Sequence, residues 1–113
     1  AVLARSLEAG RQLRLDSTAS AADGLLPQAV GDRNWEVLSS VGVVAEVIGE
    51  QQLLESLRIL RRDCQIEAEP SGACSVAPLL APTPSRTLPG GTHVAVISGG
   101  NVSAERLEQL LRR

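Results

Sequence analysis

Apolar side chains gather in two short runs, at residues 43–48 and 93–97. Both runs are rich in β-branched residues, and Val94, Val96 and Ile97 leave no regular polar alternation for solvent. Such a pattern is typical of strands that are covered on both faces. We therefore expect two strands, of which the one at residues 93–97 is buried on both faces, and the helical patterns around them predict an α/β fold.

Helical spacing is clearest in the middle of the chain. Leu53, Leu57 and Leu60 recur at i, i+4 and i+7, which predicts a helix opened by Gly49 and Glu50. With 113 residues, the chain is long enough for one compact unit with a single core. Shorter apolar patterns predict further helices over residues 1–9, 34–41, 69–80 and 103–113.

Several residues are suited to helix ends. Gly10 suits a left-handed cap at the end of the first helix, and Asn34 is a candidate cap for the second. Pro70 fits a first helical turn, where its missing N–H would be unpaired anyway. Pro78 is expected to kink that helix or stop it early, and the proline-rich stretch 81–91 is expected to be a surface loop.

The composition narrows the function classes. One Trp, with no Phe, Tyr or Met, makes the expected core aliphatic. A net charge of -2 gives no electrostatic reason to expect nucleic acid or a membrane surface, so we expect a cytoplasmic protein. Cys64 and Cys74 are expected to be reduced, packed thiols, and one His with two Cys is too few for a metal site. All 11 basic residues are arginine, and the chain has no lysine.

The second apolar run leads directly into Ser98, Gly99, Gly100 and Asn101. Ser98 places a hydroxyl, both donor and acceptor, at the carboxyl end of the expected strand. The two glycines lack Cβ and allow a ligand to approach the backbone, while the N–H groups of the next helix favour an anion. The same pattern also fits a plain turn between a strand and a helix, or a phosphate or nucleotide turn in a small standalone domain.

Three segments, at residues 22–25, 69–73 and 96–102, stand in the order and approximate spacing seen in one known family. They read Ala-Asp-Gly-Leu, Glu-Pro-Ser-Gly-Ala and Val-Ile-Ser-Gly-Gly-Asn-Val. Together they resemble the end of the threonine and serine dehydratases that depend on pyridoxal phosphate, a group that includes serine racemase. The resemblance covers nearly the whole chain. It implies that residues 1–113 form a carboxyl-terminal portion of the large domain of pyridoxal-phosphate enzymes of fold type II. This portion would have three layers of sheet and helices.

The resemblance implies a cofactor, pyridoxal 5'-phosphate, and four residues that contact it. Ser98 resembles the residue that hydrogen-bonds the pyridine nitrogen, and Gly99 would let the backbone approach the edge of the ring. Gly24 resembles the glycine that packs on one face of the ring. Glu69 resembles a glutamate near the ring, although a carboxylate at a helix start is the plainer interpretation.

The implied activity is that of an ammonia-lyase. It removes water and ammonia from a hydroxy amino acid and leaves a 2-oxo acid. A neutral hydroxyl at Ser98 suits this elimination, because it does not force protonation of the ring nitrogen as a carboxylate would. Substrate-binding residues of the family precede the segment that matches Ala1. The preference for threonine or serine as substrate therefore stays open, and so does the choice between dehydration and racemisation. The resemblance also implies a homo-oligomer when the protein is complete.

The chain departs from the family in ways that limit this interpretation. The family needs a lysine to bind the cofactor and move the α-proton, so this chain holds no catalytic residue and is expected to be inactive alone. No second glycine-rich loop is present to hold the cofactor phosphate. Val2 stands where some members have an acidic residue near a cation site. Because Ala1 falls within an expected helix, we expect a chain truncated at its amino end; a non-catalytic remnant that pairs with a partner chain is the other interpretation.

Overall fold

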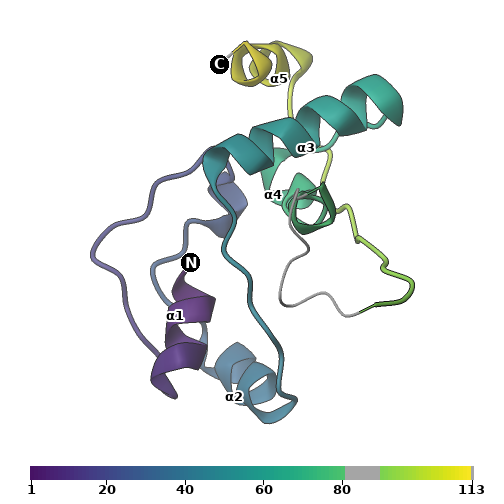
Figure 1. Cartoon of the computed structure of the whole chain (residues 1–113). Helices are drawn as coiled ribbons and strands as arrows, with labels where there is room; N and C mark the ends of the chain where they lie inside the picture. Colours follow the sequence, from purple (N-terminus) through teal and green to yellow (C-terminus); the bar gives the residue numbers. More distant parts are fainter. Residues whose placement is uncertain (81–89, 113) are drawn as a thin grey trace. The chain divides into compact units, whose positions relative to one another are not determined.

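The computed structural model describes residues 1–80 and 90–112, and the described residues are helical with loops between the helices (Figure 1). Most of the expected 81–91 loop lies outside the described residues. No helix among the described residues is long and apolar enough to cross a membrane. The elements in chain order are α1 (Val2–Ala9), η1 (Asp23–Leu25), α2 (Asp32–Ser40), α3 (Glu50–Asp63), α4 (Pro70–Ala73), η2 (Ala77–Leu80) and α5 (Ala104–Leu111), where η marks a 3-10 helix.

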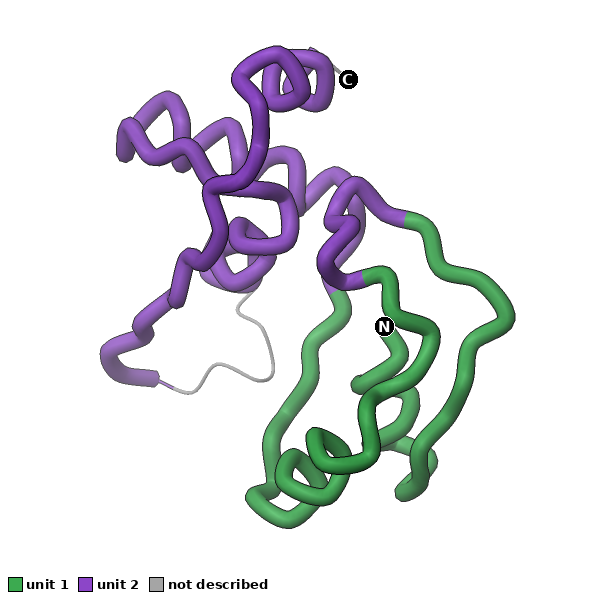
Figure 2. The backbone as a smooth tube through the Cα atoms, turned by 180° about the vertical axis from the view of Figure 1, so that it is seen from behind, with its two compact units in different colours: residues 1–19, 26–47 green, residues 20–25, 48–113 purple. Residues whose placement is uncertain are grey.

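The chain divides into two compact units, coloured separately in Figure 2. The first unit holds residues 1–19 and 26–47, and the second holds residues 20–25 and 48–113. Helices α1 and α2 belong to the first unit, and the other helices to the second. All four residues predicted to contact a cofactor therefore lie in the second unit.

Helix α1 ends as the sequence predicts. Gly10 has φ 64° and ψ 14°, and its N–H donates to the carbonyl oxygen of Leu7 at 3.2 Å. Glycine adopts this left-handed conformation without a steric penalty, so the cap closes the last turn. The buried hydroxyl oxygen of Ser6 then accepts the N–H of Leu13 at 3.0 Å and holds the chain that follows.

Helix α2 begins earlier than the sequence predicts. Gly31 is its N-cap, and the N–H of Trp35 donates to the carbonyl oxygen of Gly31 at 2.8 Å. Asn34 lies inside the helix, so its predicted role as the cap is wrong. Asp32 occupies the first turn, where negative charge is favoured by the helix dipole, and this placement explains the earlier start.

The core of the second unit lies along α3. Leu53, Leu57 and Leu60 are at most 3% exposed, and they pack with Ala73 of α4 and Leu107 of α5. The predicted helix and its apolar face are thus confirmed. Burial of aliphatic side chains at this spacing supplies the main stabilisation that binds the helices of this unit together.

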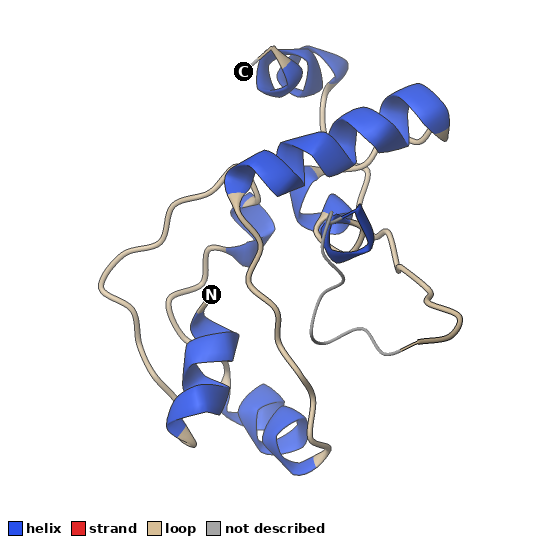
Figure 3. Ribbon diagram, viewed as in Figure 1, coloured by secondary structure: helices blue, strands red, loops and turns tan. Residues whose placement is uncertain are grey.

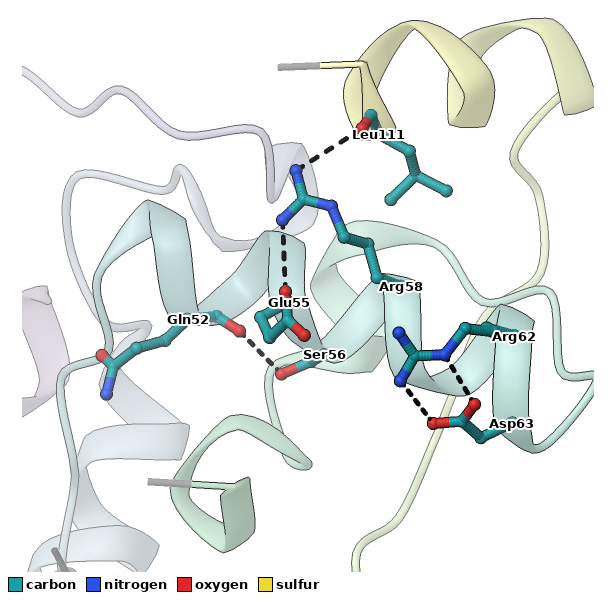
Figure 4. Close-up of polar contacts among 7 residues, drawn as sticks. All are labelled: Gln52, Glu55, Ser56, Arg58, Arg62, Asp63 and Leu111. Carbon is teal, nitrogen blue, oxygen red and sulfur yellow. Dashed lines mark hydrogen bonds and ion pairs between the residues drawn. The ribbon is translucent and has the colours of Figure 1, made fainter. Parts of the chain in front are cut away.

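Polar side chains of α3, both exposed and buried, supplement this core (Figure 4). Arg58 forms an ion pair with Glu55 at 3.4 Å and donates to the carbonyl oxygen of Leu111 at 3.4 Å, which links α3 to the end of α5. Ser56 is fully buried, and its hydroxyl donates to the carbonyl oxygen of Gln52 at 2.8 Å. The buried hydroxyl therefore carries no unsatisfied donor, and the exposed ion pair adds little.

Helix α4 begins at Pro70, as predicted, but stops after Ala73. The helix expected over residues 69–80 is therefore interrupted, but the interruption lies after Ala73 and not at Pro78, where the sequence predicts the stop. From there the N–H of Val76 donates to the carbonyl of Ala73 at 3.1 Å, and Leu79 donates to Val76 at 3.0 Å. These i to i−3 bonds tighten the chain into the 3-10 helix η2, a conformation in which Pro78 can lie.

The two predicted strands are not confirmed, because Figure 3 shows only helices and loops among the described residues. The predicted burial of residues 93–97 is wrong for this chain by itself, since Val94 is 84% exposed and Val96 is 72% exposed. Val44, in the other run, is 71% exposed. A strand needs a neighbouring strand to accept its backbone hydrogen bonds, and none lies beside either run among the described residues.

Truncating the centre of the leucine face should destabilise the second unit. We expect Leu57→Ala to lower the free energy of unfolding by about 2–5 kcal/mol, since it leaves a cavity beside α4 and α5. Denaturant unfolding followed by circular dichroism measures this loss. Gln51→Ala, on the exposed side of the same helix, is the control and should stay within about 0.5 kcal/mol of the parent chain. Equal losses in the two variants would contradict the packing described above.

Candidate functional site

Helix α4 brings together two of the predicted segments, residues 69–73 and 96–102. Gly99 has φ 74°, and a Cβ built on it would lie 2.8 Å from Cγ of Glu69 and closer still to its carboxyl group. Only glycine combines this conformation with so close an approach. The structure therefore places Glu69 directly against the turn that carries Ser98.

Gly72 has a role that the sequence alone did not assign. It is buried, and a Cβ on it would overlap the carbonyl oxygen of Ser98 and lie 2.8 Å from the carbonyl carbon. The backbone of Ser98 thus rests on the helix, with no side chain between them. A glycine inside a short helix is a sequence signal for such close packing, and this one lies within the segment that carried the resemblance.

Gly24 lies against the same helix through a different residue. Its N–H donates to Oγ of Ser71 at 2.9 Å, and a Cβ on Gly24 would lie 2.8 Å from that oxygen. The same N–H also reaches Oδ1 of Asp23 at 2.8 Å, which fits a carboxylate that stabilises a turn. Glu69, Ser98, Gly99 and Gly24, the four predicted contact residues, are therefore all tied to α4 and its N-cap.

The two polar side chains of this site differ in their surroundings. Ser98 is exposed, and no hydrogen bond joins its hydroxyl to another described residue. Glu69 is half-buried and occupies the N-cap of α4, but its carboxylate makes no capping hydrogen bond. The position of Glu69 agrees with the plainer interpretation of a carboxylate at a helix start, and its side chain also lies against Gly99.

The site can offer a hydroxyl, a carboxylate and backbone groups to a ligand, and a serine hydroxyl can donate to a ring nitrogen or accept a proton. The arginines along α3 serve other contacts: Arg58, Arg61 and Arg62 line an open groove with Leu111. Each of the three is paired with an acidic residue. Among the described residues, no group of three or more His, Cys, Asp or Glu could hold a metal ion.

The two cysteines are free thiols in different environments. Cys64 is exposed, so the expectation that it is packed is wrong. Cys74 is partly buried at the end of α4. Burial, followed by the negative charge of Glu50, raises the pKa of the Cys74 thiol, because both disfavour the thiolate.

Comparison with known proteins gives a consistent set of relatives, although no family model matches the chain. An L-threonine dehydratase from Mycobacterium tuberculosis is 32% identical over 115 residues, covering all of this chain and 26% of the relative. A crystal structure of a threonine deaminase is 35% identical with a TM-score of 0.64, covering 70% of this chain and 27% of that one. The structure of maize serine racemase has a TM-score of 0.77 at 27% identity, covering 98% of this chain and 34% of that one.

The chain is therefore homologous to part of the threonine dehydratases and has the fold of part of serine racemase. This confirms the resemblance stated on the three sequence segments. The chain spans about a quarter of the length of the curated relatives it matches, with 22%, 25% and 26% in three of them. What the relatives do as whole enzymes is thus not a property of these residues alone.

The close approach of Gly99 to Glu69 predicts an effect of substitution at Gly99. We expect Gly99→Ala to lower the free energy of unfolding by about 1–3 kcal/mol, because it combines a strained positive φ with a clash. Denaturant unfolding measures the loss. Gly42→Ala is a matched control with φ 68° and no atom within 4 Å of its Cβ, so it should lose less. The packing would be refuted by equal losses at the two positions.

The two thiols should differ in reactivity. With iodoacetamide near pH ~8, we expect Cys64 to be alkylated first, because it is exposed, while the raised pKa of Cys74 lowers its thiolate fraction. Since the shift is upward, alkylation of Cys74 should accelerate only at higher pH than for an ordinary thiol. Peptide mass spectrometry follows each site, and the unfolded chain serves as the control in which the two rates converge. Faster labelling of Cys74 in the folded chain would show that it is not partly buried.

Proposed function

We propose that these residues form the wall of a pyridoxal 5'-phosphate site that faces the pyridine ring, within an ammonia-lyase of the threonine and serine dehydratase type. The whole enzyme would remove water and ammonia from a hydroxy amino acid and release a 2-oxo acid. The observation that carries the proposal is that Gly24, Ser98 and Gly99 each lie against helix α4 or its N-cap residue, Glu69. Homology to threonine dehydratases supports it over nearly the whole chain.

The residues present suit the pyridine side of this cofactor. Ser98 offers an exposed hydroxyl that can donate to a ring nitrogen, and it stays neutral near physiological pH. Gly99 lets its backbone lie against the Glu69 side chain, which fills the position that a Cβ would occupy. Bound pyridoxal phosphate supplies the electron-withdrawing ring that stabilises negative charge on the amino acid. In this proposal Ser98 orients the pyridine ring, and the Glu69 side chain limits how far the ring can move past Gly99.

Other parts of the chemistry must come from outside this chain. No lysine is present to bind the cofactor or move a proton, and the arginines of α3 are engaged with acidic neighbours. We therefore propose that residues 1–113 are a carboxyl-terminal segment that is not competent alone. The share of the relatives that the chain covers, about a quarter, leaves ample length for a lysine and a phosphate-binding loop.

The exposed apolar runs fit the same proposal. Val94 and Val96 would be covered if residues 93–97 paired with strands from the rest of a longer polypeptide, and Val44 likewise in the run 43–48. The three-layer, sheet-and-helix arrangement expected from the sequence would then be completed by that remainder. We further propose that the complete enzyme is a homo-oligomer of the cytoplasm that acts on a small amino acid and binds no nucleic acid or membrane.

Substitution of Ser98 in the longer enzyme tests the proposal. We expect Ser98→Ala to weaken pyridoxal phosphate binding about tenfold, since it removes one hydrogen bond worth about 1–1.5 kcal/mol. It should also slow release of 2-oxo acid from threonine or serine. Cofactor fluorescence and a 2-oxo acid assay measure the two effects. Ser17→Ala, an exposed serine of the first unit, is the control and should change neither.

Two outcomes would contradict the proposal. Unchanged cofactor affinity and unchanged turnover in Ser98→Ala would show that this hydroxyl does not face the ring. Failure of the longer enzyme to bind pyridoxal phosphate at all would favour a non-catalytic role for the chain.

A further inference from the structure

We propose that Ser71 and Ser75 are positioning residues, whose hydroxyls hold the two cofactor-contacting segments, at Gly24 and at Ser98, on helix α4. The inference rests on the proposed function, and it assigns roles to two side chains that touch no reacting group themselves. Its basis is that each hydroxyl joins α4 or the turn after it to a segment distant in sequence.

Ser71 holds the first segment. Its Oγ accepts the N–H of Gly24 at 2.9 Å across a separation of 47 residues. A Cβ on Gly24 would lie 3.2 Å from Cβ of Ser71, so the two residues also pack without room for a larger side chain. A hydrogen bond together with this contact fixes both the direction and the distance of the Gly24 backbone relative to α4.

Ser75 holds the second segment. Its hydroxyl donates to the carbonyl oxygen of Val96 at 2.8 Å, with a longer contact to the carbonyl oxygen of Gly72 at 3.3 Å. Val96 lies two residues before Ser98, so this bond sets where the Ser98 hydroxyl emerges. Gly72 lets the Ser98 carbonyl approach the helix, but that contact is steric and has no preferred direction.

The hydrogen bond from Ser75 restrains a segment that has no backbone pairing with a neighbouring strand among the described residues. The run 93–97 has no strand beside it among the described residues, and Val94 and Val96 are exposed. Ala95 and Ile97 pack against the core, and the hydrogen bond from Ser75 adds a directional restraint at the exposed Val96 between them. Loss of either hydroxyl should loosen its own segment and leave the other in place.

The experiment uses the longer enzyme that contains this chain, with Ser71→Ala and Ser75→Ala made separately. Hydrogen exchange is measured first on the cofactor-free protein. Ser71→Ala should raise the exchange rate of the Gly24 amide about two- to fivefold, because Oδ1 of Asp23 still accepts this N–H. Ser75→Ala should raise the exchange rates of the amides of residues 97–100 about five- to tenfold. Each variant should leave the segment held by the other serine unchanged.

The second measurement is cofactor affinity, followed by fluorescence. Both alanine variants should weaken pyridoxal phosphate binding several-fold, and Ser75→Thr, which keeps a hydroxyl at an exposed position, should restore it. Ser39→Ala is the matched control, because its hydroxyl bonds the carbonyl oxygen of Trp35 within its own helix and joins no distant segment. Ser75→Cys, nearly equal in size, replaces Ser75→Ala should the latter fail to fold.

The outcomes separate the two proposals. Exchange rates unchanged in both alanine variants would overturn the positioning roles, whatever the cofactor does. Increased exchange with unchanged cofactor affinity, in these variants and in Ser98→Ala alike, would overturn the proposed function instead. Increased exchange, weaker cofactor binding and recovery with threonine together support the inference.

Discussion

The close approach of the Ser98 backbone to helix α4 is the constraint on which the candidate site depends. It is possible only because Gly72 has no Cβ, since any side chain there would overlap the Ser98 carbonyl oxygen. Gly99 continues the same constraint, because its positive φ turns the chain beside Glu69. One short helix thus sets the position of a hydroxyl and a carboxylate that lie far apart in the sequence.

The position of α4 is itself fixed by apolar packing against α3. Leu53, Leu57 and Leu60 form a dry face against which Ala73 packs, and Leu107 of α5 completes the cluster. The same packing reaches the loops on either side of α4, because Ala22 belongs to the cluster and Ile97 packs against it. Hydrogen bonds from Ser71 and Ser75 add directional contacts to the two loops. In the second unit, apolar packing and a few hydrogen bonds from serine side chains together hold the segments of the candidate site.

The absence of lysine is compatible with the proposed function. A cofactor site divides into groups that orient the ring and groups that carry out proton transfer, and these need not come from one part of the chain. Under the proposed function, Ser98 and Glu69 belong to the first kind, and the second kind lies elsewhere in the longer enzyme. The exposed valines at 94 and 96 point to the same conclusion by a separate route, since they are apolar surface that further strands of a longer polypeptide would cover.

The sequence by itself determined the local features: the leucine face of α3, the Gly10 cap, the start of α4 at Pro70 and the absence of lysine. These follow from periodicity and from residues whose backbone preferences act within a few positions. It predicted strands that need partners the described chain does not supply, and it misplaced the start of α2. Only the tertiary structure decided that Gly72 meets Ser98, that Glu69 lies against Gly99 and that Ser75 bonds Val96. Those contacts join residues 21 or more positions apart, and no local pattern records which distant backbone a small side chain will meet.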